Sequence, residues 1–284
     1  MTGNLICNNI TCLASWNLTV RPAMSQACIQ FTDYTLGYRH HAAVHHLNGT
    51  VHQGTLTALV GANGSGKSTL LKGIVGALRP MTGRCQIARK QRIAYLPQQS
   101  ELDRSFPADV WSLVSLGLWP RRGLLGRHCQ QDRAAIADAL HTVGLQGFER
   151  RGLDTLSGGQ VQRALFARVL VQNANLILLD EPFNAIDANT LDALLVLIKQ
   201  WQHEGRTVLV VVHDLDLVRA HFPQTLLLAR ELIAWGETQA TLTPDNLALA
   251  RQQHESWNEH APWCVITETA NDTMPDAHAQ TRPA

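Results

Sequence analysis

One eight-residue segment constrains this chain more than any other. Residues 61–68 read Gly-Ala-Asn-Gly-Ser-Gly-Lys-Ser, which fits the pattern G-x-x-x-x-G-K-[ST]. Glycines in that pattern let the backbone curl around an anion, so that successive N–H groups surround the phosphates of a nucleotide. An apolar run at 55–60 predicts a buried strand before the loop, and apolar residues at helical spacing follow between Leu70 and Leu78. The sequence therefore predicts a strand, a loop that binds ATP or GTP, and a helix whose positive N-terminus faces the phosphates.

Two members of this loop have distinct expected roles. Lys67 can reach the β and γ phosphates, and the hydroxyl of Ser68 is placed to ligate Mg²⁺. The predicted phosphate-binding set is Gly61, Ala62, Asn63, Gly64, Ser65, Gly66, Lys67, Ser68 and Thr69.

Two further motifs narrow the class of nucleotide-binding protein. Residues 156–160 read Leu-Ser-Gly-Gly-Gln and open a helical stretch, and residues 176–182 read Leu-Ile-Leu-Leu-Asp-Glu-Pro. Four apolar residues predict a strand buried in a sheet, with Asp180 and Glu181 at its carboxyl end, where α/β folds place ligands. Together with the phosphate loop, these segments resemble the ATPase subunit of ABC transporters. In that family LSGGQ is the signature, and an apolar run ending in Asp-Glu is the Walker B strand.

The resemblance assigns roles to three other positions. Gln98, in Tyr-Leu-Pro-Gln, matches the Q-loop glutamine, which in the family touches Mg²⁺ and the attacking water and senses the membrane subunit. His213 follows the apolar run 208–212 and matches the switch histidine. Asp187 matches the D-loop aspartate that crosses the dimer interface, and here it ends Asn-Ala-Ile-Asp where the family usually has Ser-Ala-Leu-Asp.

The resemblance also implies how the nucleotide is enclosed. Tyr38 matches the aromatic residue that stacks on adenine, and Tyr34 lies near enough in sequence to compete for that role. Two subunits of the family meet head to tail, so that the signature of one caps the ATP held by the other. The signature residues expected at the nucleotide are Ser157, Gly158, Gly159 and Gln160.

Phosphoryl transfer requires charge neutralisation and an oriented nucleophile. Lys67, the loop N–H groups and Mg²⁺ are expected to hold the phosphates, and the predicted metal ligands are Ser68, Gln98 and Asp180. Glu181 is the expected residue that polarises the attacking water, with His213 positioning that water and the γ phosphate. The predicted catalytic residues are thus Glu181, His213 and Gln98.

The composition excludes several other classes of function. With 284 residues, 45% of them hydrophobic and 17% charged, the chain fits one soluble ATPase core. Its longest apolar runs are of strand length, so a membrane function must be supplied by a partner. A net charge of +1 without a Lys/Arg block argues against nucleic acid as a partner. Six cysteines without C-x-x-C spacing indicate neither a zinc site nor a disulfide framework, and they suit a reducing cytoplasm.

The motifs divide the chain into three parts. Residues 1–24 are expected to be a dispensable N-terminal extension, with Met24 as the natural start. Residues 25–240 are expected to form an α/β P-loop ATPase domain with a mixed sheet core and a helical signature subdomain at about 105–172. Residues 241–284 are predicted to be a polar C-terminal tail. Five histidines between 40 and 52 suggest a metal site, but a surface turn followed by a strand into the core is the preferred interpretation.

The segment after Gln98 bears on the cargo. Residues 103–110 read Asp-Arg-Ser-Phe-Pro-Ala-Asp-Val and are followed by Val-Ser-Leu-Gly, which is similar to importers of zinc, manganese or iron. This resemblance implies a second ATPase subunit, a polytopic membrane permease, an indirect extracytoplasmic binding protein, and a peripheral location at the cytoplasmic face of the inner (plasma) membrane. Phe106 is expected either to be core or to contact a helix of the permease in a groove between the two halves of the domain.

Two alternatives to metal-ion import stay open. One is the ATPase of a ferric-siderophore or haem importer, against which the Phe-Pro pair argues mildly. The other, less favoured, is an ABC ATPase that acts on DNA or ribosomes. Repair proteins of that kind insert a long coiled coil and ribosomal ones carry two ATPase domains, and the sequence indicates neither feature.

Overall fold

The structure is a computed structural model that describes residues 26–39, 41–101, 103–123, 126–184 and 186–255. The predicted N-terminal extension lies outside the described residues, as do residues 256–284 of the predicted tail. Among the described helices, none is long and apolar enough to cross a membrane.

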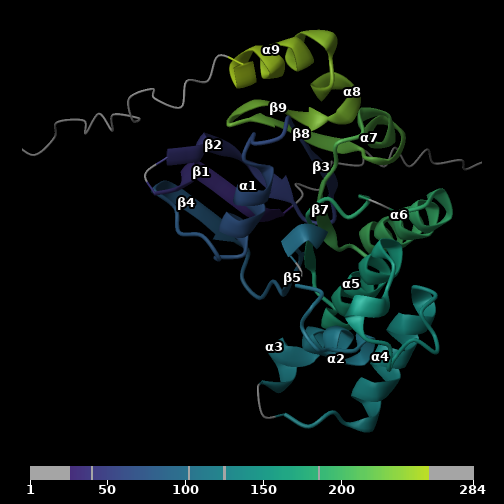
Figure 1. Ribbon diagram of the computed structural model, residues 1–284. Coiled ribbons are helices and arrows are strands. Elements are labelled where there is room, and N and C mark those ends of the chain that lie inside the picture. The colour runs from purple at the N-terminus through teal and green to yellow at the C-terminus, as the bar shows by residue number, and fades with distance from the viewer. Residues whose placement is uncertain (1–25, 40, 102, 124–125, 185, 256–284) are drawn as a thin grey trace, which may run out of the picture.

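A six-stranded sheet in the order β5-β6-β7-β3-β8-β9 forms the centre of the molecule (Figure 1). The first five strands of this order are parallel, and β9 is antiparallel to β8. The apolar runs predicted to be buried strands form β3, β6 and β7, in which every residue is buried, as expected for parallel strands covered on both faces. The strands of this sheet are β3 (Leu56–Val60), β5 (Ile93–Leu96), β6 (Leu176–Leu179), β7 (Thr207–Val211), β8 (Gln224–Ala229) and β9 (Glu231–Glu237).

A second, three-stranded antiparallel sheet has the order β2-β1-β4. The histidine-rich segment forms most of β2, and its member His45 is buried, as the strand interpretation requires. Over the described part of the chain, no group of three His, Cys, Asp or Glu side chains is placed to hold a metal ion. The strands of this sheet are β1 (Ala27–Tyr38), β2 (His41–His52) and β4 (Thr82–Ile87).

The pleat of the central sheet divides its side chains between two hydrophobic cores. Leu176 and Leu178 of β6 belong to the core shared with the second sheet and α1 (Lys67–Ile74). Ile177 and Leu179 belong to the core shared with the helical part of the molecule. Because successive residues of a strand point to opposite faces, one buried strand joins both cores.

The helices beside the central sheet include one that is shorter than its sequence pattern predicts. Helical spacing extends to Leu78, but α1 ends at Ile74, because the chain turns at Gly76, which has a φ of +77°. Leu78 still packs against the core from beyond the helix. The other helices here are α6 (Ala188–His203) and α7 (Leu215–His221).

Helices gather in a separate region below the sheets in Figure 1. The apolar face predicted for one of them is confirmed, since Ile136, Ala139 and Leu140 of α4 are buried. Helix α5 packs against both α2 and α4 and reaches β5 of the sheet, so it connects the two regions. The helices here are α2 (Val110–Ser115), α3 (Trp119–Arg122), α4 (Gln130–Thr142) and α5 (Gly158–Gln172).

The beginning of the predicted polar tail contains a helix that the sequence analysis did not predict. Helix α8 (Thr238–Thr241) and helix α9 (Pro244–Glu255) follow β9 directly. Leu247 and Ala250 of α9 pack against the core, and α9 contacts β8 and β9. The apolar residues of α9 are confined to one short run, 247–250, which is too brief to predict a helix by its spacing, and two of them pack against the core.

Candidate active site

The phosphate loop joins β3 to α1 and requires glycine at specific positions. Gly66, with a φ of +96°, precedes the first residue of α1, and a Cβ added there would lie 2.4 Å from the carbonyl oxygen of Ala43. Gly64 also has a left-handed backbone, with a φ of +79°. Non-glycine residues rarely adopt this conformation, so the backbone bends as the sequence pattern predicts.

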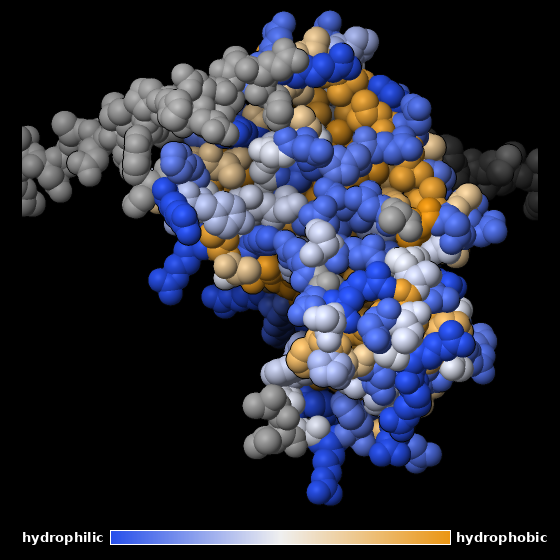
Figure 2. All heavy atoms as spheres, viewed as in Figure 1, coloured by the Kyte–Doolittle hydropathy of each residue, from blue (hydrophilic) through white to orange (hydrophobic). Residues whose placement is uncertain are grey.

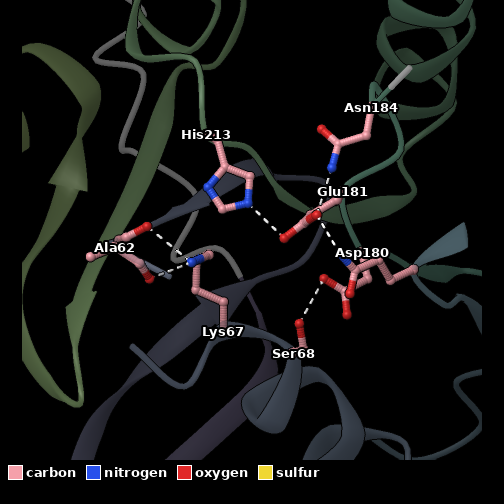
Figure 3. A network of polar contacts seen from close by, with 9 residues as sticks. Ala62, Lys67, Ser68, Asp180, Glu181, Asn184 and His213 are labelled. Atoms are coloured by element: carbon pink, nitrogen blue, oxygen red, sulfur yellow. Dashed lines mark hydrogen bonds and ion pairs between the residues drawn. The ribbon is translucent and has the colours of Figure 1, made fainter. Parts of the chain in front are cut away.

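Lys67 lies buried inside the loop (Figure 3). Its Nζ donates hydrogen bonds to the carbonyl oxygens of Gly61, at 2.9 Å, and Ala62, at 2.7 Å. Burial lowers the pKa of the Lys67 ammonium, while Glu181 and Asp180 oppose that change. An anion bound in the loop would compensate the same desolvation, since an opposite charge favours the charged form.

Asp180 and Ser68 meet at the carboxyl end of β6. The Ser68 hydroxyl donates to Asp180 Oδ1 at 3.1 Å, whereas Oδ2 of the fully buried Asp180 has no hydrogen-bond partner among the residues that the structure describes. Burial, helped by the carboxylates of Glu181 and Glu101, raises the pKa of Asp180 to about 6. A buried carboxylate oxygen with no partner beside a hydroxyl is a donor set that suits Mg²⁺, a hard cation that prefers oxygen ligands.

Glu181 receives hydrogen bonds from three side chains (Figure 3). Oε2 accepts from Gln98 Nε2 at 2.7 Å and from Asn184 Nδ2 at 2.6 Å, and Oε1 lies 2.6 Å from Nε2 of His213. The Glu181 backbone is left-handed, with a φ of +50°, which costs of the order of 1–3 kcal/mol and is typical of functional sites. Segments from different parts of the chain thus converge on one carboxylate.

These residues line an open pocket of about 750 Å³. The sequence analysis predicted most of its lining but not Ala43 or Asn184. Asn184 stands inside the Asn-Ala-Ile-Asp motif, so its departure from the usual serine was an available signal, whereas Ala43 belongs to the other sheet and had none. The lining residues are Ala43, Asn63, Gly64, Gly66, Lys67, Ser68, Thr69, Gln98, Glu181, Asn184 and His213.

The signature residues are not among those that line this pocket. Ser157 precedes α5 and forms a capping box with Gln160. The Ser157 hydroxyl accepts from the Gln160 backbone N–H at 3.3 Å, and Gln160 Oε1 accepts from the Ser157 N–H at 2.9 Å. Gly158 and Gly159 form the first turn of α5. Within the described chain, the signature therefore begins a helix and is separate from the nucleotide pocket.

Asp187 is engaged within its own chain. Its carboxylate begins α6, with Oδ1 accepting from the Thr190 backbone N–H at 2.9 Å and Oδ2 accepting from the Thr190 hydroxyl at 2.7 Å. These hydrogen bonds lower the pKa of Asp187. Oδ2 also lies 3.9 Å from the position of a Cβ on Gly159, which places the D-loop beside the signature helix.

Of the two tyrosines that competed for the adenine, burial excludes one. Tyr34 is 1% exposed and packs against the ring of Phe31, with 5.6 Å between ring centroids. Tyr38, at the end of β1, is 48% exposed and free to stack on a base. Tyr34 therefore serves the core, and Tyr38 stays the predicted adenine contact.

A second hollow, of about 360 Å³, lies between the sheet region and the helical region. Phe106 is 66% exposed, so the interpretation of Phe106 as a core residue is wrong for the isolated chain. Phe106 is also not among the residues that line the hollow. On the face seen in Figure 2, hydrophilic side chains cover most of the helical region, with apolar groups between them. The hollow is lined by Val75, Ile93, Tyr95, Pro97, Leu116, Arg168 and Gln172.

Fold and site together define a P-loop nucleotide-binding protein of the ABC type. Residues 44–184 match the family model of the ABC transporter. The chain is 38% identical over 222 residues to the manganese transport system ATP-binding protein MntB of Listeria monocytogenes, covering 76% of this chain and 92% of that relative. It is 37% identical to the zinc transport system ATP-binding protein TroB of Treponema pallidum, covering 76% and 84% of the two chains.

A solved structure agrees with these relatives. An inward-facing ABC transporter described as of the metal-chelate type matches with a TM-score of 0.71 and 30% identity, over 80% of this chain and 90% of that one. The chain belongs to the ABC transporter family, and it is an ATPase subunit of that family.

Proposed function

We propose that this chain hydrolyses ATP at the Glu181 pocket to energise the uptake of a metal ion. The observation that carries the ATPase site is the Glu181 carboxylate, held by three side chains beside the Ser68–Asp180 pair. The proposal that the cargo is a metal ion rests on similarity to relatives named for manganese and zinc transport, which this chain matches over 92% and 84% of their length.

In the proposed reaction each residue does one thing. Lys67 leaves the carbonyl oxygens of Gly61 and Ala62 and donates to the β and γ phosphates. Ser68, Asp180 and Gln98 are the residues that would hold Mg²⁺, and the ion would neutralise phosphate charge there. Water bonds to the γ phosphorus and gives its proton to Glu181, while the bond from that phosphorus to the bridging oxygen breaks.

The nucleotide requires a second subunit in this proposal. The signature residues Ser157, Gly158, Gly159 and Gln160 are absent from the lining of their own chain's pocket, and they begin a helix whose N-terminus favours a phosphate. In a head-to-tail homodimer the signature of each chain closes the pocket of the other. The exposed Tyr38 stacks on the adenine.

The membrane partner contacts the hollow between the two regions. Its lining combines apolar side chains of the sheet region with Leu116 of the helical region, and Leu116 is itself exposed. A short helix of a polytopic permease suits such a surface. The subunit then works at the cytoplasmic face of the inner membrane, and an extracytoplasmic binding protein delivers the cargo without touching it.

Ferric-chelate import is the second candidate, because the matched transporter structure is described as of the metal-chelate type. Action on DNA or ribosomes is not favoured by any feature of the described residues, in which the longest helix is α6, of 16 residues. A bare metal ion and a chelate differ in charge and size, so uptake assays separate these candidates.

The test measures uptake in cells that lack this chain. Labelled manganese, zinc, iron and a ferric siderophore are supplied in parallel arms, with the wild-type chain or Glu181→Gln reintroduced. We expect the wild-type chain alone to restore uptake of a bare ion and to copurify with a polytopic membrane protein. Restoration of the siderophore only would select the second candidate, and full uptake without the chain in every arm would overturn the proposal.

A further inference from the structure

The hydrogen bonds to Glu181 distinguish its two oxygens. A carboxylate oxygen has two lone pairs that accept hydrogen bonds. Oε2 accepts from both Gln98 Nε2 and Asn184 Nδ2 and is therefore saturated, whereas Oε1 has a single partner in the described chain, His213 Nε2. One lone pair of Oε1 is thus left for a further donor.

We propose that Asn184 is a positioning residue that saturates Glu181 Oε2, so that Oε1 is the oxygen that receives the proton of the attacking water. This inference rests on the proposed function, in which Glu181 accepts that proton. As the water oxygen bonds to the γ phosphorus, its proton passes to Oε1, and the electron pair of the broken bond stays on the β-phosphate oxygen of ADP.

The local geometry explains why Asn184 reaches Glu181. The Asn184 backbone N–H points at the carbonyl oxygen of Glu181, at 3.4 Å, so residues 181–184 form a turn that brings the amide back over the carboxylate. The amide donor to an ionised acceptor is a charge-assisted hydrogen bond, which is short here, at 2.6 Å. Figure 3 shows the Asn184 amide and the His213 ring approaching Glu181 from different directions.

Holding one oxygen matters because a glutamate side chain has several rotatable bonds. Gln98 also donates to Oε2, but the same amide is a proposed ligand of Mg²⁺ and is expected to reorient when the metal binds. Asn184 is not among the proposed metal ligands, so it can keep Oε2 in place through the reaction. A misplacement of about 1 Å in such a site can lower a rate by about 100-fold.

A purely structural role makes a different prediction. Asparagine and aspartate both stabilise turns through their side-chain oxygens, so a turn-forming Asn184 tolerates aspartate. A positioning Asn184 does not, because Asn184→Asp keeps the shape, removes the N–H donor and places a second carboxylate against Oε2. A comparison of the kcat values of Asn184→Ala and Asn184→Asp therefore separates the two roles.

The experiment compares variants of the full chain by kcat, the KM for ATP, binding of a fluorescent ATP analogue and melting temperature at pH 7.5. We expect Asn184→Ala to lower kcat by about 10-fold, Asn184→Asp to lower it by about 100-fold, and both to leave KM and binding within about two-fold. Asn184→Gln, which keeps the donor, is expected to turn over faster than Asn184→Ala. Gln200→Ala, the matched control, removes an amide–carboxylate hydrogen bond to Glu204 on the outside of α6 and leaves kcat unchanged.

The outcomes distinguish this inference from the proposed function. If Glu181→Gln lowers kcat but the kcat of Asn184→Asp equals or exceeds that of Asn184→Ala, the positioning role of Asn184 is wrong. Glu181 then stays the proposed base. If Glu181→Gln turns over like the wild type, the role of Glu181 itself fails. If Asn184→Ala has a lowered melting temperature, the kcat values of Asn184→Asp and Asn184→Gln are compared instead. A higher kcat for Asn184→Asp overturns the inference.

Discussion

The sheet region and the helical region use their polar groups in different ways. In the sheet region, polar side chains from α1 and from the segments after β5, β6 and β7 converge on one pocket, and Lys67 and Asp180 are buried there or beside it. In the helical region, the polar groups of the signature satisfy each other at the start of α5 and are not among those lining that pocket. The sheet region thus gathers its polar groups around one pocket, whereas the signature residues of the helical region reach a nucleotide only in the proposed homodimer.

We therefore expect substitutions in the two regions to have different effects. Burial perturbs the pKa values of Lys67 and Asp180, and the backbone of Glu181 is left-handed, so a change at one of these residues is expected to disturb chemistry. The signature residues have ordinary helix-start geometry, so we expect a change there to disturb the proposed dimer instead. The following substitutions test that separation.

The largest effect is expected in the sheet region. Glu181→Gln should keep ATP binding and lower turnover by roughly two to four orders of magnitude, the range expected when a positioned general base is lost. Single-turnover hydrolysis and nucleotide binding measured on the same preparation test this. Glu204→Gln removes a carboxylate from the surface pair with Arg206 and serves as the control. Turnover near that of the wild type would remove Glu181 from the role.

Ser157→Arg tests the helical region. The added bulk and charge should abolish ATP-dependent dimerisation and lower turnover to background, while ATP binding by the single chain persists. Ser157→Ala loses the cap of α5, worth about 1 kcal/mol, without the bulk, so it controls for the loss of helix stability. Light scattering with ATP under slow turnover reports the dimer. A Ser157→Arg chain that still dimerises would contradict the separation of the two regions.

Asp180→Asn tests the electrostatic cost of burying the Asp180 carboxylate. Burial raises the pKa of Asp180 from 3.8 to about 6, so the folded chain holds this proton more tightly than the unfolded chain. The free energy of unfolding therefore decreases as pH rises through this interval and stays lowered above it. Without nucleotide, Asp180→Asn should be more stable than the wild type by about 1–3 kcal/mol at pH 7.5, with a smaller difference at pH 5.

Melting curves at the two pH values measure this effect. The same variant should lose the extra stability that Mg²⁺ with ATP confers on the wild type, because its amide is a weaker metal ligand. Equal melting temperatures at both pH values would show that the ionised Asp180 is solvated better than its burial indicates.

The smallest effect on stability is expected for Phe106→Ala. Because Phe106 is 66% exposed, its truncation should change the free energy of unfolding by less than about 0.5 kcal/mol. A contact with the membrane partner would instead appear as weaker copurification and reduced uptake at unchanged ATPase rate. Val196→Ala, at a position of equal exposure on α6, is the matched control. A loss of 3–5 kcal/mol would restore the core interpretation.

The sequence by itself determined the elements that are local in the chain. The phosphate loop depends on Gly64 and Gly66, whose left-handed backbones are a property of the residue type. The buried strand before Asp180 and the helix start at Ser157 follow from a short apolar run and from a capping pair three residues apart. Each signal spans a few neighbouring residues, so a linear pattern contains all of it.

Only the tertiary structure decided what depends on distant contacts. Tyr34 and Tyr38 lie on the same strand, β1, and burial distinguishes them because Tyr34 belongs to the core shared with the central sheet and α1, whereas Tyr38 is exposed. Helix α9 forms where composition indicated a tail, because two of its residues dock on the core. Asn184 joins the site through its contact with Glu181, a hydrogen bond that depends on the left-handed turn of that residue. Burial and convergence arise from packing, and no single stretch of sequence contains them.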